Sequence, residues 1–249
     1  MKVLTMLVLL LLPSSLMAQP SDSTKIKTGM YFNISAKGTR ELIDLNEQLQ
    51  AAGHVPLVET LFGTALGVTN RFADQNSYST TYVSLLVGSD NSPDNSRSTT
   101  LFVWELGNTA HYDVIANPRW LVYPYLGTGL NYGRLTVSAI DPNGTFQNSL
   151  SNLSNTEVVQ KKYGSDGLML FGELGGGVER VLKLPGSYTY VGLSGGYRLS
   201  TQQPWILAGV KTFEESFGTQ GWTVELKFRF EANPEANPNA RRGLFRFFK

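Results

Sequence analysis

The chain has 249 residues and a formal net charge of +1, with 25 glycines, 11 tyrosines, 13 phenylalanines and no cysteine. Without cysteine it cannot be a disulfide-stapled protein, so its stability must come from packing or from a membrane. A net charge this close to zero gives no attraction for nucleic acid, and we expect no nucleic-acid partner.

Residues 1–18 have the pattern of a cleavable secretory signal peptide. Lys2 precedes an apolar run from Val3 to Leu12, and the segment ends on the small residue Ala18. This pattern is typical of exported proteins. No later stretch is uniformly apolar for the roughly 18 residues that a transmembrane helix requires, so insertion into a membrane would have to use strands.

Most of the remaining chain alternates between apolar and polar residues. Such alternation predicts β-strands with one apolar and one polar face. The eight predicted strands are residues 30–36, 61–68, 78–88, 99–113, 120–137, 168–184, 188–199 and 222–230. A short amphipathic helix is expected between Thr39 and Ala52, because leucines recur there at helical spacing and Gly53 and Pro56 follow.

The last predicted strand has the clearest alternation and leaves two architectures open. One face holds Trp222, Val224, Leu226, Phe228 and Phe230, and the other holds Thr223, Glu225, Lys227 and Arg229. In a transmembrane barrel the apolar face contacts lipid and the polar face lies inside. In a soluble calyx the two faces are exchanged.

The connections between the predicted strands favour the membrane barrel, because they are long and short in alternation. Outer-membrane barrels have short periplasmic turns and longer extracellular loops, and an even strand number leaves both termini in the periplasm. The longest connections are Lys37–Glu59, Ser138–Asp166 and Thr201–Gln220. We therefore predict an all-β fold over residues 19–230, an eight-stranded antiparallel up-and-down transmembrane β-barrel with a short helix in its first extracellular loop.

With its signal-like start, eight alternating strands, loop asymmetry and phenylalanine-ended last strand, the chain resembles the small outer-membrane β-barrel proteins, of the general type of the OmpA membrane domain. The resemblance implies residence in the outer membrane and contact with its lipid. It also implies that Phe228 and Phe230 act as a recognition signal for the barrel assembly machinery. The chain departs from that signal in two ways, since Glu225 stands where a glycine is expected and the sequence continues beyond Phe230.

The polar strand faces predict a charged barrel interior. An eight-stranded barrel is only wide enough for side chains to fill it, and buried opposite charges must pair to offset their desolvation. We expect a salt-bridged plug, with a narrow ion or proton path as the alternative. Tyr188 and Tyr190 are expected beside the charged set, which consists of Glu105, Glu173, Glu179, Arg198, Glu225, Lys227 and Arg229.

No catalytic, metal or cofactor site is predicted. His54 and His111 are the only histidines, and both are expected at the surface or the membrane interface. Some small outer-membrane barrels are lipid A deacylases with a His-x-Ser pair, but Tyr112 and Asp113 follow His111. The carboxylates between Asp90 and Asp94 lack the spacing of a calcium loop and are expected in a turn.

Residues 231–249 are predicted to form a periplasmic tail. Two Glu-Ala-Asn-Pro repeats give an extended spacer, and a basic and aromatic segment follows. That segment could lie on the membrane surface or dock a periplasmic partner, and a frayed end is the alternative. Its residues are Arg241, Arg242, Phe245, Arg246, Phe247, Phe248 and Lys249.

Together these features predict a non-enzymatic outer-membrane barrel with a structural or surface-interaction role, in which the extracellular loops bind any partner protein. The alternatives are a narrow channel and a soluble periplasmic lipocalin-like carrier of a small apolar ligand. In the carrier, Val191, Leu193, Trp222 and Phe228 would line the cavity.

Overall fold

A computed structural model describes residues 26–72, 76–94, 96–115, 117–140, 158–184, 187–207 and 211–232. The expected signal peptide and the tail segment from Arg241 to Lys249 lie outside these ranges.

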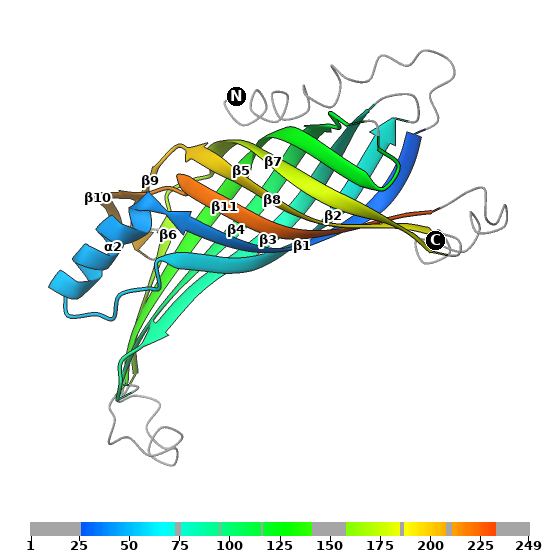
Figure 1. The fold of residues 1–249 in the computed structure, drawn as a ribbon. Helices are drawn as coiled ribbons and strands as arrows, with labels where there is room; N and C mark the ends of the chain where they lie inside the picture. The colour runs from blue at the N-terminus through cyan, green and yellow to red at the C-terminus, as the bar shows by residue number, and fades with distance from the viewer. Residues whose placement is uncertain are drawn as a thin grey trace, which may run out of the picture.

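Eight strands close into an antiparallel barrel (Figure 1). They are β1 (Ile26–Thr39), β2 (Thr60–Phe72), β3 (Ser77–Asn91), β4 (Arg97–Tyr112), β5 (Trp120–Ile140), β7 (Met169–Leu184), β8 (Ser187–Ser200) and β11 (Gly221–Ala232). The last strand pairs with the first from Gly29–Glu231 to Thr39–Gly221, and this pairing closes the barrel. The predicted fold class, including the strand number of the barrel, is therefore confirmed.

Three further strands extend the sheet beyond the barrel. They are β6 (Val158–Ser165), β9 (Gln203–Leu207) and β10 (Lys211–Phe217). The first part of β5 pairs with β7 from Trp120 to Asn131, and its last part pairs with β6 from Arg134 to Ile140. The extension lies at the end of the barrel that carries the long connections, which we call the loop end; the opposite end is the turn end.

These strands correct the prediction that residues 138–166 and 201–220 are loops throughout. They lie beyond the barrel, where both faces of a strand can carry polar residues, so the alternation that marks the barrel strands is absent from their sequence. The predicted first loop is also shorter than expected at its start, because β1 continues through Lys37 to Thr39.

The helix α2 (Arg40–Ala51) forms in the first connection, as predicted, and lies at the loop end (Figure 1). Its leucines and the inward faces of the extended strands bury one another. The resulting apolar cluster, which we call the loop-end cap, consists of Leu42, Leu45, Leu49, Leu57, Leu61, Leu86, Leu101, Val103, Leu135, Val137, Met169, Trp205 and Phe217. Within the part of the chain described, no helix is long and apolar enough to cross a membrane.

The outer face of the barrel is apolar and the inner face is polar. On β11, Thr223, Glu225, Lys227 and Arg229 are buried, whereas Trp222 is 46% exposed. Leu193 on β8 is 56% exposed. A soluble calyx would place Trp222 and Leu193 inside, so the alternative of a lipocalin-like carrier was wrong.

Outward aromatic rings mark two levels of the barrel wall. On β5, Trp120 lies at the turn end and Tyr132 near the loop end, where it is opposite Trp104 of β4. The segment of β5 from Trp120 to Tyr132 is about 40 Å long. At the usual strand tilt this length corresponds to a height of about 30 Å along the barrel axis. This height matches the hydrocarbon thickness of a bilayer, and aromatic rings favour its two interfaces.

The midplane of this band gives a test of the lipid-facing wall. Leu126, midway between Trp120 and Tyr132, is 58% exposed. We expect Leu126→Arg to reduce the free energy of unfolding from a bilayer by about 2–4 kcal/mol, because it places a cation in hydrocarbon. Denaturant titration in lipid vesicles, followed by tryptophan fluorescence, measures this change.

The matched control is Thr100→Arg. Thr100 precedes Trp104 on the outward face of β4, towards the loop end, and at that level the same substitution should cost no more than about 1 kcal/mol. Equal losses in the two variants would contradict the assignment of the outer face to lipid.

Candidate functional site

The charged side chains inside the barrel form its candidate site, and the first group is centred on Arg198 of β8. Arg198 Nη2 lies 2.8 Å from Glu173 Oε2, and Arg198 Nη1 contacts Glu105 Oε1. Lys37 Nζ lies 2.7 Å from the other oxygen of Glu105. The four side chains come from β1, β4, β7 and β8, so these ion pairs join opposite walls of the barrel.

A second group is centred on Arg229 of β11. Its Nη2 lies 3.0 Å from Glu179 Oε2, and its Nη1 lies 3.5 Å from Glu231 Oε1. Tyr78 and Tyr190 flank the guanidinium, with ring centroids 4.2 and 3.9 Å from its central carbon. The cation is therefore held by both carboxylates and aromatic faces.

Lys227 and Glu225, also on β11, complete the network. Lys227 Nζ lies 3.3 Å from Glu225 Oε2 and 4.8 Å from the centroid of the Tyr125 ring. Each member of the network is buried and has an ion-pair partner. The arrangement fills the lumen with fixed charges of both signs, four cations and five carboxylates.

The structure places all seven charged residues named from the sequence in this network and adds Lys37 and Glu231. These two residues were not predicted, because Lys37 falls in the predicted first loop and Glu231 in the predicted tail. Both continue the inward register of their strands: Lys37 follows Tyr31, Asn33 and Ser35 on β1, and Glu231 follows Arg229 on β11. Extending the alternation by a few residues would have found them.

Tyrosines on β5 donate hydrogen bonds to two of the carboxylates. Tyr125 donates a hydrogen bond to Glu173 Oε1 at 2.7 Å, and Tyr123 donates one to Glu179 Oε1 at 2.8 Å. Gly175 and Gly177 of β7 make room for these rings, because a Cβ at either glycine would come within 2.7 Å of a tyrosine ring. These two glycines of β7 thus leave the space that the two rings occupy.

His111 lies inside the barrel, which corrects the expectation of a surface or interfacial residue. It is 4% exposed and stacks on Tyr78, with ring centroids 4.3 Å apart. Its Nε2 lies 2.7 Å from Thr109 Oγ1. His111 shares the inward register of Glu105 on β4, and this two-residue spacing was the signal that could have placed it.

His54 and Asp94, both considered in the sequence, lie at the loop end. His54 follows α2 and is partly buried; burial and the nearby Arg97 lower its pKa. Asp94 accepts hydrogen bonds from Ser92 Oγ at 2.5 Å and Ser96 Oγ at 2.7 Å, which lower its pKa to about 2. Asp94 therefore organises a turn, and within the described ranges no cluster of His, Asp and Glu could hold a metal ion.

Phe228 and Phe230, the predicted assembly signal, lie towards the turn end of β11 on its outer side. Phe230 is exposed, and Phe228 faces Phe32 of β1 with ring centroids 5.9 Å apart. Their use by the barrel assembly machinery stays a prediction.

The network predicts a large loss of stability when its central cation is removed. Arg198→Met should reduce the free energy of unfolding by about 3–5 kcal/mol, because Glu173 and Glu105 stay buried with a partner missing. The measurement is the denaturant midpoint of the folded band on an unboiled gel. Arg134→Met is the control: Arg134 is exposed on β5 and should change stability by less than about 0.5 kcal/mol. An unchanged midpoint for Arg198→Met would contradict the role of the ion pairs.

No protein-family model matches the chain, and no curated protein is detectably similar to it in sequence. Among solved structures, a major outer membrane protein from Thermus thermophilus is 12% identical, with 82% of this chain and 98% of that chain covered and a TM-score of 0.45. Neisserial surface protein A is also 12% identical, with coverage of 85% and 99% and a TM-score of 0.39. The attachment invasion locus protein Ail of Yersinia pestis is 9% identical, with coverage of 84% and 98% and a TM-score of 0.39. The strand pairing and the facing of the side chains identify this chain's fold as a small eight-stranded barrel of the outer-membrane type.

Proposed function

We propose that the protein is a non-enzymatic outer-membrane barrel that holds a rigid interaction surface outside the cell. The inverted polarity of its wall is the observation that carries this proposal. An apolar outer face is stable in lipid, and a polar inner face requires the internal pairing that the ion-pair network supplies.

The orientation follows from the two ends of the barrel. The connections at the turn end are short, and β1 begins there and β11 ends there. Both features are expected on the periplasmic side of an outer-membrane barrel. The loop end, with α2 and the sheet extension, then faces outwards. An N-terminal signal peptide at residues 1–18 is consistent with export to this location.

The loop end has the architecture of a binding platform. The loop-end cap packs α2 against β2, β3, β4, β5, β9 and β10, so the outer surface is carried by a folded layer. Loops held on a rigid scaffold are the usual sites of recognition. Exposed cations lie on this layer, at Arg97, Arg134, Lys161 and Lys162.

The interior supports an anchoring role over a channel. Between the charge network and the loop end, the loop-end cap adds a cluster of buried apolar side chains, which favours a closed lumen. A conducting path would require water beside the buried ion pairs, which are instead packed against tyrosine rings.

We also propose that the last strand and the tail that follows it have separate partners. Phe228 and Phe230 would be read by the barrel assembly machinery, and the basic and aromatic segment from Arg241 to Lys249 would contact lipid phosphates or a periplasmic protein. Deletion of residues 240–249 tests the second role, which is wrong if membrane retention and co-purifying partners do not change.

Location and orientation can be tested with single cysteines, because the native chain has none. Gln48→Cys lies on the exposed face of α2, and Asn117→Cys lies in a turn at the other end. A membrane-impermeant maleimide should label Gln48→Cys on intact cells and Asn117→Cys only after the outer membrane is permeabilised. Both variants should stay in the carbonate-washed outer membrane and run as heat-modifiable bands.

The opposite labelling pattern would reverse the orientation, and recovery in the soluble periplasmic fraction would refute the membrane assignment. Currents across a planar bilayer at the level of a porin would contradict the closed interior.

A further inference from the structure

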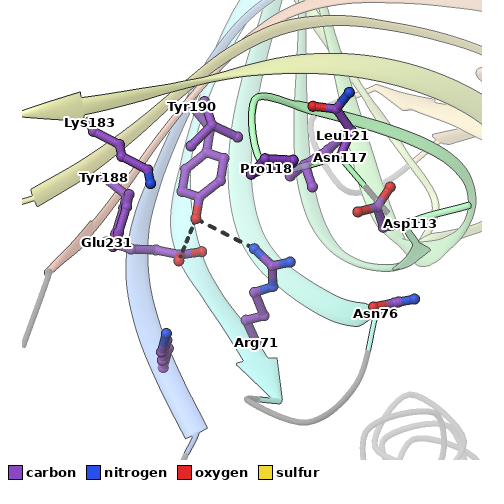
Figure 2. Close-up of a pocket in the computed structure, with 12 residues that line it drawn as sticks. Arg71, Asn76, Asp113, Asn117, Pro118, Leu121, Lys183, Tyr188, Tyr190 and Glu231 are labelled. Carbon is purple, nitrogen blue, oxygen red and sulfur yellow. Dashed lines mark hydrogen bonds between the residues drawn. The ribbon is translucent and has the colours of Figure 1, made fainter. Parts of the chain in front are cut away.

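The turn end of the barrel opens into a cavity of about 490 Å³, which we call the vestibule (Figure 2). Its wall includes the cations Lys27, Arg71 and Lys183 and the acids Asp113 and Glu231. A cavity of this size suits a small molecule. Its position at the turn end separates it from the proposed platform at the loop end.

The vestibule cations differ from those deeper in the barrel, because no acid in the described ranges forms an ion pair with them. Arg71 Nη1 lies 3.4 Å from the hydroxyl of Tyr190, and Lys183 Nζ lies 6.0 Å from the centroid of the Tyr188 ring. Figure 2 shows the side chain of Arg71 directed at Tyr190. These cations have donors available for a ligand.

The two acids of the wall already have partners. Glu231 Oε2 accepts a hydrogen bond from Tyr190 at 2.9 Å, and its other oxygen faces Arg229 at 3.5 Å. Asp113 Oδ1 accepts the backbone N–H groups of Ile115 at 3.2 Å and Val122 at 3.3 Å. The acids thus have partners other than Lys27, Arg71 and Lys183, and the vestibule wall holds three cations against two acids.

The register brings two of these cations together. Lys27 is directly opposite Arg71 across β1 and β2, on the inward face that also carries Tyr31 and Thr69. Like charges directly opposite each other on a sheet are destabilising. An anion bound between the side chains of Lys27 and Arg71 would replace this repulsion with attraction.

We propose that the vestibule binds a small multivalent oxyanion, bearing phosphate or several carboxylates, that enters from the turn end. The three cations supply charge-assisted hydrogen bonds to such a group. Membrane phospholipid does not fit, because the cations face the lumen and lipid contacts the outer wall. The chain's own tail does not fit either, because its last ten residues carry Arg241, Arg242, Arg246 and Lys249.

The test is calorimetric titration of the detergent-folded full-length protein with inorganic pyrophosphate and, in a second arm, with citrate. Saturable binding of pyrophosphate alone would assign the site to phosphate, and binding of citrate alone would assign it to carboxylates. Arg71→Gln/Lys183→Gln should weaken binding at least about tenfold, because it removes two charged donors.

Arg134→Gln/Lys162→Gln is the matched control, since it removes two exposed cations at the other end of the protein. It should leave the affinity unchanged. A second variant, Asn76→Asp, places a negative charge on the rim without removing a cation, and should also weaken binding. The unboiled gel confirms that each variant is folded.

The proposal is overturned if neither anion binds the wild-type protein, or if the control loses as much affinity as the vestibule variants. If Arg71→Gln/Lys183→Gln does not fold, Asn76→Asp decides, and unchanged affinity in that variant overturns the proposal. The titration uses purified protein, so its outcome is independent of the proposed extracellular role.

Discussion

Closure of the sheet between β1 and β11 is the constraint on which the rest of the structure depends. In hydrocarbon, every backbone N–H and C=O group must find a partner within the protein, and only a closed sheet leaves no edge. Once the barrel is closed, the side chains of each strand divide between lipid and lumen. Lys227 and Arg229 must then lie inside, because Trp222, Val224 and Leu226 lie outside on the same strand. The ion-pair network is thus a consequence of closure combined with a two-residue period.

The ion pairs in turn fix the register of the strands. A shift of one residue along β8 would turn Arg198 towards lipid and leave Glu105 and Glu173 without it. Both results place unpaired charge at low dielectric, where the free-energy penalty is several kcal/mol. A buried ion pair adds little stability relative to a well-packed apolar core, but it excludes the alternative registers strongly. The glycines opposite Tyr123 and Tyr125 serve the same end, since only one alignment of β5 and β7 gives the rings their space.

The barrel could be predicted from sequence because lipid and lumen impose opposite polarity on neighbouring residues. The eight strands and the charged interior follow from that alternation, whereas the first-loop helix follows from the helical spacing of its leucines. The strands β6, β9 and β10 could not be predicted in this way, because they lie where both faces of a strand can be polar. Their pairing also depends on the last part of β5, from Arg134 to Ile140. The position of His111 was wrongly predicted for another reason. Its place in the alternation of β4 was not used, although Glu105 on the same strand indicated that odd-numbered residues face inwards.

The side chains inside the barrel differ in polarity between its two ends, and this difference limits what the interior can do. At the loop end, α2 and the sheet extension contribute apolar side chains to the loop-end cap. At the turn end, the wall extends past Arg229 to a ring of cations without acidic partners among the described residues. A solute that enters the turn end meets Arg229 and its carboxylates, which are already paired, and cannot displace them without leaving charge buried alone. In the proposed site, the buried ion pairs therefore form the floor of the vestibule, and anion binding there would need no passage through the barrel.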